Sequence, residues 1–238
     1  MHSADNGCLV NESSASRFNF GRIAHRYDAW YRTPRGAMYD RLETRAIDRL
    51  LPCVPNGGRL LEIGCGTGHW SEYFSNKGFD VTGIDVSEQM IAIARQKKVS
   101  HAIFDVSDAA TLPFGDGSFD AAAAITSLEF TADPAGVVAE MVRCVKKAGG
   151  MLIVGVLNRL SAYNRGKKRK AASMYASANL FSPADLRNLL SPFGEPTVLV
   201  TGFVPRCDLL IGLSPVLEWA GGLTGNQRGA FLAAKVTL

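Results

Sequence analysis

Short apolar runs alternate with stretches of helical spacing through the middle of the chain. The runs are typical of strands buried on both faces, and they lie at residues 59–63, 79–84, 102–104, 118–125 and 151–156. Helical spacing predicts helices after Gly68 as far as Gly78, and at 87–98 and 134–147. Strands that alternate with helices, without tandem repeats, predict an α/β fold with a doubly wound parallel sheet, because right-handed crossovers place helices on both faces.

The segments before the first strand and after the fifth add to this alternation. Residues 18–31 are unusually aromatic, and two interpretations stay open: a helix that packs on the core, or a lid whose aromatic side chains close over a ligand. Residues 36–51 follow helical spacing and predict a structural helix. Further predicted elements are a helix at 182–190 and the last two strands at 197–203 and 229–238. We expect this organisation: a disordered polar lead at 1–16, and one domain at 17–238 with a helical lid at 17–51 and substrate-side insertions at 157–181 and 204–228.

A glycine loop follows the first predicted strand. Gly64, Gly66 and Gly68 stand at two-residue spacing, where a residue without Cβ lets the backbone turn tightly and press against a ligand. Asp85 and Asp105 each close a later strand, and a strand-end carboxylate can accept hydrogen bonds from ribose hydroxyls or an adenine amine. Because ligands bind at the carboxyl ends of such sheets, we expect these groups and residues 126–130 to form one site.

Composition narrows the class of protein only slightly. The 238 residues are 47% hydrophobic, enough for a full core, and the formal charge of +4 neither demands nor excludes a nucleic-acid partner. The five cysteines are scattered without a C-x-x-C pair, which argues against a disulfide framework and a zinc site and favours a reducing, cytoplasmic setting. No run of eighteen apolar residues occurs, so we expect no membrane span.

The spacing of the glycine loop excludes two nucleotide-binding motifs. A dinucleotide fingerprint requires G-x-G-x-x-G, but His69 follows Gly68, and the G-K-[ST] of a P-loop is absent. The run from Leu61 to Gly68, Leu-Glu-Ile-Gly-Cys-Gly-Thr-Gly, with Asp85 and Asp105 at their spacings, resembles the class I S-adenosylmethionine-dependent methyltransferases. The segment 20–31 also resembles the lid of methyltransferases of ubiquinone and menaquinone biosynthesis.

The resemblance implies a fold, a cofactor and a set of site residues. The fold is a Rossmann-like sheet of seven mostly parallel strands with an antiparallel edge strand and a helical lid at the amino end. The cofactor is S-adenosylmethionine, with S-adenosylhomocysteine as its product. The methionine end would be held by Glu62 and the loop Gly64, Cys65, Gly66 and Gly68, and the ribose by Asp85. The adenine would lie against Val86, Met90, Asp105 and Val106. The remaining cofactor contacts would come from Thr126 and the lid residues Tyr27 and Trp30.

The methyl acceptor is not identified by these motifs. A general base is needed only for an acceptor that is protonated at working pH, and the candidates are Glu129, His25 and His69. The segment 158–174 carries six basic residues, interpreted either as a solvated loop or as a surface that attracts an anionic acceptor. The apolar stretch 209–223, broken by Pro215 and glycines, suits a pocket wall or a dimer contact better than a membrane span.

We therefore expect a methyltransferase that acts on a small molecule. Two alternatives remain. A nucleic-acid methyltransferase is disfavoured because residues 126–130 lack the Asn/Asp-Pro-Pro-aromatic motif of enzymes that methylate base amines. The other alternative is a non-catalytic protein that binds S-adenosylmethionine. An anionic acceptor and a homodimer are left open as partners.

Overall fold

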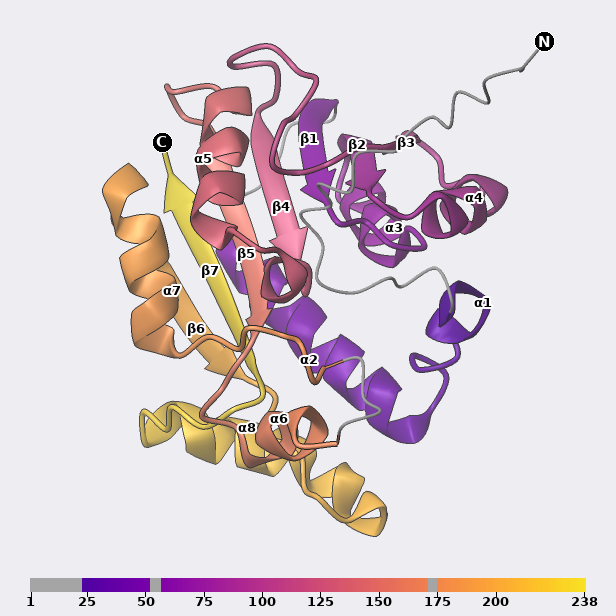
Figure 1. The fold of residues 1–238 in the computed structure, drawn as a ribbon. Helices are drawn as coiled ribbons and strands as arrows, with labels where there is room; N and C mark the ends of the chain where they lie inside the picture. Colours follow the sequence, from indigo (N-terminus) through magenta and orange to yellow (C-terminus); the bar gives the residue numbers. More distant parts are fainter. Residues whose placement is uncertain (1–22, 52–56, 171–174) are drawn as a thin grey trace, which may run out of the picture.

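The computed structural model describes residues 23–51, 57–170 and 175–238. The expected polar lead at 1–16, the first residues of the aromatic segment and the end of the basic segment lie outside these residues. A seven-stranded sheet in the order β3-β2-β1-β4-β5-β7-β6 forms the centre of the molecule (Figure 1). Its strands are β1 (Gly58–Ile63), β2 (Phe79–Asp85), β3 (Ala102–Val106), β4 (Ala121–Ile125), β5 (Met151–Leu157), β6 (Thr197–Thr201) and β7 (Phe231–Thr237).

The first five strands are parallel, and the chain order reverses between β1 and β4. Leu60 pairs with Val81 of β2 on one side and with Ala121 of β4 on the other. β7 runs antiparallel to both β5 and β6. The expected α/β fold with an antiparallel strand near one edge is confirmed. The order reversal creates the crevice in which ligands of doubly wound sheets bind.

Helices cover both faces of the sheet. The helices are α1 (Ala24–Tyr27), α2 (Pro34–Leu50), α3 (His69–Asn76), α4 (Glu88–Gln96), α5 (Pro134–Cys144), α6 (Ala162–Lys168), α7 (Pro183–Leu190) and α8 (Ser214–Leu223). Short 3-10 turns are η2 (Leu128–Phe130), η3 (Ser191–Phe193) and η4 (Asp208–Leu213). α5 and α7 pack on one face, with Met141 and Leu186 in its core, and α2 and α3 pack on the other, with Ile47 and Phe74 fully buried. α1, α6 and α8 lie beyond the carboxyl ends of the parallel strands (Figure 1).

The predicted elements are all found, with a few ends moved by tertiary contacts. The fourth strand begins at Ala121 rather than Ser118, because residues 115–118 form a turn and Phe119 makes only an isolated bridge to Val145. That bridge holds Val145 in an extended conformation, so the preceding helix ends at Cys144 and not at Lys147. The basic segment, interpreted as a loop, contains α6, and the apolar stretch 209–223 is helical throughout.

Candidate active site

The glycine loop between β1 and α3 needs its glycines for two different reasons. Gly64, Gly66 and Gly68 all have positive φ, at 66°, 54° and 80°, a region that other residues rarely adopt. At Gly64 space is also missing, because a Cβ there would lie 2.5 Å from the Cβ of Ser127. The loop backbone therefore lies directly against the segment that follows β4, and the crevice between β1 and β4 is narrow.

Asp85 lies at the end of β2 and faces this crevice. Its carboxylate accepts hydrogen bonds from the backbone N–H of Gly66, at 3.0 Å, and of Ser87, at 2.9 Å. Burial raises its pKa above the usual value, and the two N–H donors oppose that shift. Val86 and Met90 line the same cleft. Asp85 thus ties the glycine loop to the start of α4 and keeps further lone pairs for a ligand.

Asp105 and Val106, expected at the adenine, do not line the cleft. β3 continues two residues beyond its predicted end, so Asp105 is a strand residue whose side chain points outward and pairs with Arg95 at 3.0 Å. The first acid beyond the strand that lines the cleft is Asp108, which sequence analysis missed. A prediction that continued the strand to Val106 would have placed Asp108, two residues beyond its end, at the crevice.

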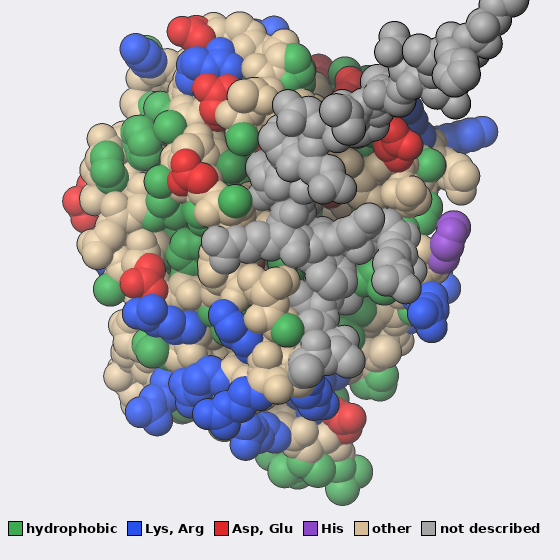
Figure 2. Space-filling view, in the orientation of Figure 1, with side chains coloured by type: hydrophobic (Ala, Val, Ile, Leu, Met, Phe, Trp, Pro, Cys, Tyr) green, Lys and Arg blue, Asp and Glu red, His purple; other side chains and the backbone are tan. Residues whose placement is uncertain are grey.

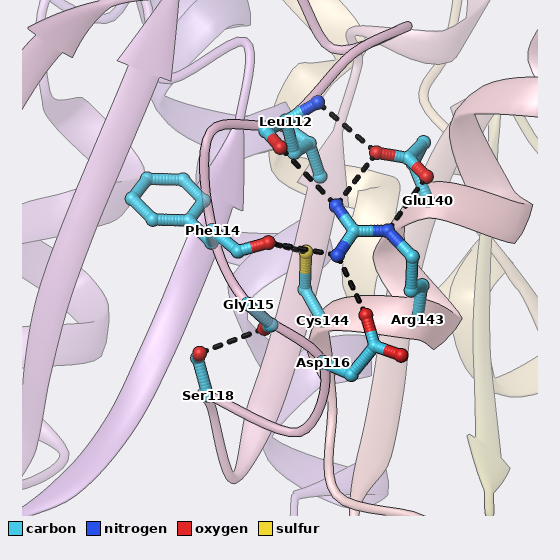
Figure 3. A network of polar contacts seen from close by, with 8 residues as sticks. All are labelled: Leu112, Phe114, Gly115, Asp116, Ser118, Glu140, Arg143 and Cys144. Atoms are coloured by element: carbon cyan, nitrogen blue, oxygen red, sulfur yellow. Dashed lines mark hydrogen bonds and ion pairs between the residues drawn. The ribbon is translucent and has the colours of Figure 1, made fainter.

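Arg143 of α5 holds the loop that leads away from Asp108 (Figure 3). Its guanidinium donates to the backbone oxygens of Leu112, at 3.1 Å, and Phe114, at 2.7 Å, and it pairs with Glu140 and Asp116 at 2.8 Å each. Five donors in one planar fork can bind several loop groups at once. The network fixes residues 112–116 against α5, and none of its residues lines the cleft.

Three other predicted cofactor contacts are buried behind the cleft instead of lining it. Glu62 is 2% exposed and accepts a hydrogen bond of 2.5 Å from the hydroxyl of Ser71 in α3. The thiol of Cys65 packs with Ile91 and Phe104, and Gly68 is the N-cap residue of α3. The side chain of Glu62 points to the helix because its strand neighbours, Leu61 and Ile63, occupy the opposite face. Glu62 therefore supports the glycine loop from behind.

The buried carboxyls predict that the ligand-free protein loses stability as pH rises. Burial raises the pKa of Glu62 to about 8 and of Glu129 to about 7, from an ordinary value of 4.5, and Glu43 shifts to about 8 as well. The folded state then binds more protons than the unfolded state, so the stabilisation is complete below pH 4.5 and is lost as pH rises to about 8. Urea unfolding should give a free energy that falls with rising pH, by roughly 1 kcal/mol per pH unit for Glu62 up to about pH 8 and for Glu129 only up to about pH 7. A smaller slope in Glu129→Gln supports the assignment, and an unchanged slope contradicts it.

Two cavities lie side by side at the carboxyl end of the sheet. The cleft is lined by Gly64, Gly66, Asp85, Val86, Met90, Ser107, Asp108 and Ala109 among others. The chamber lies between α1, α2 and α6. Tyr27, Thr126 and Phe130 line both. Thr126 has φ of 50°, a conformation that is costly for a β-branched residue, and its N–H donates to the oxygen of Gly155 at 2.7 Å. Backbone strain is therefore stored where the two cavities meet.

The described part of the aromatic segment is bound to the glycine loop. Tyr31 stacks on His69, with ring centroids 3.7 Å apart, and His69 Nε2 lies 2.6 Å from Asp40 of α2. Asp28 accepts a hydrogen bond of 2.6 Å from Thr67 and pairs with Lys97 at 2.7 Å. Tyr27 and Trp30 of the same segment lie in the chamber wall, and the lid interpretation stays a prediction. His69 begins α3 and is held by this stack, so it is not free to act on an acceptor.

An ammonium group surrounded by aromatic rings forms one wall of the chamber. Lys167 of α6 has its Nζ 4.4 Å from the ring centroid of Trp30, 4.7 Å from that of Tyr163 and 4.6 Å from that of Tyr175. Burial lowers the pKa of Lys167 to about 8. Half-buried Glu43 of α2 also lines the chamber. The sequence analysis gave all basic residues of the segment 158–174 the same role. In the structure, the period of the helix turns Lys167 inward, whereas Arg165, Lys168 and Arg169 are exposed.

Glu129, the candidate base, lies behind the chamber wall. It is fully buried and lines neither cavity. One carboxylate oxygen accepts a hydrogen bond of 2.5 Å from the N–H of Leu157, while its backbone oxygen accepts from Asn179 at 2.7 Å. The first bond connects η2 to the end of β5, and the second connects it to the segment that precedes α7. The general-base role of Glu129 stays a prediction, and this geometry does not support it.

The cleft fits a nucleoside that carries a polar chain. It offers two acids, an apolar wall and a glycine backbone, and among the described residues the buried hydroxyl of Ser127 in its lining has no hydrogen-bond partner. An orphaned buried hydroxyl facing a cavity is suited to bind a ligand. Fold and site together define an α/β enzyme that binds a nucleoside cofactor beside a second, aromatic chamber.

Comparisons with known proteins identify the family. Residues 61–154 match a family model described as a methyltransferase domain. A ubiquinone biosynthesis O-methyltransferase of Dechloromonas aromatica is 31% identical over 63% of this chain and 66% of that enzyme. An uncharacterized protein of Methanocaldococcus jannaschii is 30% identical over 76% of this chain and 83% of its own length.

A solved structure is similar over nearly the whole chain. It is an S-adenosylmethionine-dependent methyltransferase of Thermotoga maritima, described as a possible histamine N-methyltransferase. The TM-score is 0.71 at 29% identity, with 92% of this chain and 97% of that one covered. The chain belongs to the class I S-adenosylmethionine-dependent methyltransferases, and its cofactor is S-adenosylmethionine. The predicted family, enzyme class and cofactor are confirmed.

Proposed function

We propose that methyl transfer to a small-molecule acceptor takes place where the cleft and the chamber meet. The observation that supports this is that Tyr27, Thr126 and Phe130 line both cavities, so a cofactor in one and an acceptor in the other would be neighbours. S-adenosylmethionine supplies a methyl group that is already activated by its sulfonium. The protein then has to align the acceptor and exclude water. Tyr27 and Trp30, as part of the lid, would exclude water.

The cleft residues divide among the parts of the cofactor. Asp85 would accept hydrogen bonds from the ribose hydroxyls, and Asp108 takes the role that the resemblance assigned to Asp105, accepting from the adenine amine. Met90 would pack on the ring. The backbone of Gly64 and Gly66, which both line the cleft, would follow the methionine portion.

The acceptor is proposed to carry an acidic hydroxyl that reacts as an anion. Lys167 supports this, because three ring faces stabilise its ammonium while one side of it borders the chamber. A buried cation lowers the pKa of a nearby phenol or enol and favours the reactive oxyanion. The O-methyltransferases among the relatives agree with oxygen as the attacking atom. No separate base would then be required, consistent with the buried position of Glu129.

The experiment for this proposal uses Lys167→Met and Lys167→Arg. We expect Lys167→Met to lower kcat/KM for the acceptor by roughly tenfold or more, because it removes the cation, and Lys167→Arg to retain most of the rate. Because the pKa of Lys167 is lowered to about 8, the ammonium is present below that pH and lost above it. The wild-type rate should therefore fall above pH 8, and the arginine variant should not share that fall. To find acceptors, extract fractions are incubated with the enzyme and methyl-labelled cofactor, and the labelled products are identified by mass spectrometry.

A phenol that binds in the chamber without reacting tests whether Lys167 stabilises an oxyanion. The absorbance of 4-nitrophenol reports its ionisation, so binding beside Lys167 should increase the phenolate fraction at fixed pH, and Lys167→Met should abolish the increase. If the methionine variant keeps both rate and probe response, Lys167 only packs in the wall. If labelled products appear only on amines, the anionic acceptor is excluded while methyl transfer stands.

A further inference from the structure

An apolar surface covers the outer side of η4 and α8. Leu209 is 90% exposed, and Trp219 and Leu223 are each 68% exposed. We call this surface the apolar face, and its residues are Leu209, Leu210, Leu213, Val216, Trp219 and Leu223. Val216, Trp219 and Leu223 follow one another at helical spacing, so they share one stripe of α8. Contiguous exposed apolar surface of this kind marks an interaction site in a soluble protein.

The charged groups of the same segment are bonded, Glu218 from a partly buried position and Asp208 from an exposed one. Arg35 of α2 donates to the backbone oxygens of Pro205, at 2.8 Å, and Arg206, at 2.9 Å, and pairs with Asp208. The carboxylate of Glu218 accepts from the backbone N–H of Gly202, at 3.1 Å, and of Phe203, at 3.0 Å. The segment is therefore fixed by its charged residues with its leucines directed outward, the reverse of the usual surface pattern.

Basic side chains flank the apolar face. Arg165, Lys168, Arg169 and Lys170, the basic band, are exposed at and after α6, and no acidic residue occurs between Asn158 and Lys170. In Figure 2 a group of blue side chains lies beside the green tip at the lower end of the molecule. Arg206 joins the two segments, because it donates to the backbone oxygen of Ala162 at 3.2 Å.

The second flank is also basic. Arg45 and Arg49 of α2 line a groove together with Trp219 and Leu223. Both acids of the segment are occupied, Asp208 by Arg35 and Glu218 by backbone N–H groups. A leucine- and tryptophan-rich centre between uncompensated cations is therefore the chemistry of this end of the molecule.

We propose that this end of the molecule docks on an anionic lipid bilayer. The apolar face would enter the boundary between headgroups and acyl chains, and the basic band would contact the anionic headgroups. A second copy of the chain is disfavoured as occupant, because a symmetric contact would bring the basic flanks together. Among the helices that the structure describes, none is long and apolar enough to cross a bilayer, so the contact is peripheral. One side of α6 carries residues of the basic band, and its other side lines the chamber. Docking through the basic band would therefore bring the chamber close to the lipid surface.

Sedimentation with vesicles tests the proposal. The full chain is incubated with vesicles of phosphatidylcholine alone, or with about a third of it replaced by phosphatidylglycerol. We expect binding to the anionic vesicles that weakens as salt is raised. Leu213→Ser and Trp219→Ser should each reduce the partition coefficient roughly tenfold, since each removes one buried apolar side chain. Arg169→Ser combined with Lys170→Ser should reduce both the affinity and its salt dependence.

Ile103→Ser is the matched control. Ile103 is also strongly exposed, at 62%, but it lies on β3 at the opposite edge of the sheet, so its replacement should leave vesicle binding unchanged. The fluorescence of the wild type should shift to the blue on binding, and Trp219→Phe should lose that shift. Equal binding by all variants overturns the proposal, as does equal binding to neutral vesicles. Absence of vesicle binding, with a dimer that Leu213→Ser dissociates, identifies a second copy as the occupant instead.

Discussion

Replacing Asp85 by alanine is expected to weaken binding of S-adenosylmethionine by about ten- to a hundredfold. Hydrogen bonds that involve a charged acceptor contribute roughly 1.5 to 3 kcal/mol, and the variant loses those proposed to the ribose. It also loses the bonds from the N–H groups of Gly66 and Ser87, which keep the loop in its binding conformation. Isothermal titration calorimetry with S-adenosylmethionine and with S-adenosylhomocysteine measures both affinities.

Asp105→Ala is the matched control for this variant. Both acids end a strand in the sequence pattern, but Asp105 is exposed and pairs with Arg95 outside the cleft. Its removal should leave cofactor affinity within about twofold, because exposed ion pairs contribute little. Asp108→Ala should lower affinity by roughly tenfold. If Asp105→Ala weakens binding and Asp108→Ala does not, the assignment of the adenine contact is reversed.

Gly64→Ala is expected to destabilise the protein more than any other alanine substitution in the loop. The new Cβ would lie 2.5 Å from the Cβ of Ser127, and φ of 66° adds a backbone cost of roughly 1 to 2 kcal/mol. Overpacking contributes about 1 to 3 kcal/mol more. The free energy of unfolding should therefore fall by about 3 kcal/mol in urea, and cofactor binding should fall with it.

Gly66→Ala separates the steric cost from the backbone cost. Gly66 also has positive φ, at 54°, but a Cβ there meets nothing within 4 Å, so only the backbone cost should appear. Adding Ser127→Gly to Gly64→Ala should recover the difference between the two variants. Equal destabilisation by Gly64→Ala and Gly66→Ala would mean that the loop moves away from Ser127 without cost.

The order of elements could be predicted because local patterns carry it. Continuous apolar runs such as 151–156 identify buried strands, and Pro134 and Ser182 mark helix starts at the positions that the structure confirms. The ends of elements were less certain. β3 runs to Val106 because it pairs with β2 as far as Asp85, a contact that no local pattern encodes. The predicted strand end, two residues early, made Asp105 the strand-end acid, whereas Asp108 is the acid that lines the cleft.

The chamber shows the same limit more strongly. Glu43, Tyr163 and Lys167 come from α2 and α6, which are far apart in the sequence, and their residue types alone are ordinary for exposed helices. A helix predicted at residues 162–168 would have placed Lys167 on a different face from its basic neighbours. It would not have shown the rings around Lys167, because one of them, Trp30, comes from the aromatic segment.

By itself, the sequence determined the doubly wound fold, through its alternation of strands and helices, and the glycine loop, through its spacing. The class of cofactor followed from the family that the loop and the two strand-end acids resemble. Only the tertiary structure decided which acid enters the cleft, that Glu129 is buried behind the chamber, and that Lys167 faces inward while its neighbours face out. The physical reason is that burial and pairing of a charge depend on atoms from distant parts of the chain, which meet only when the sheet and its helices have packed.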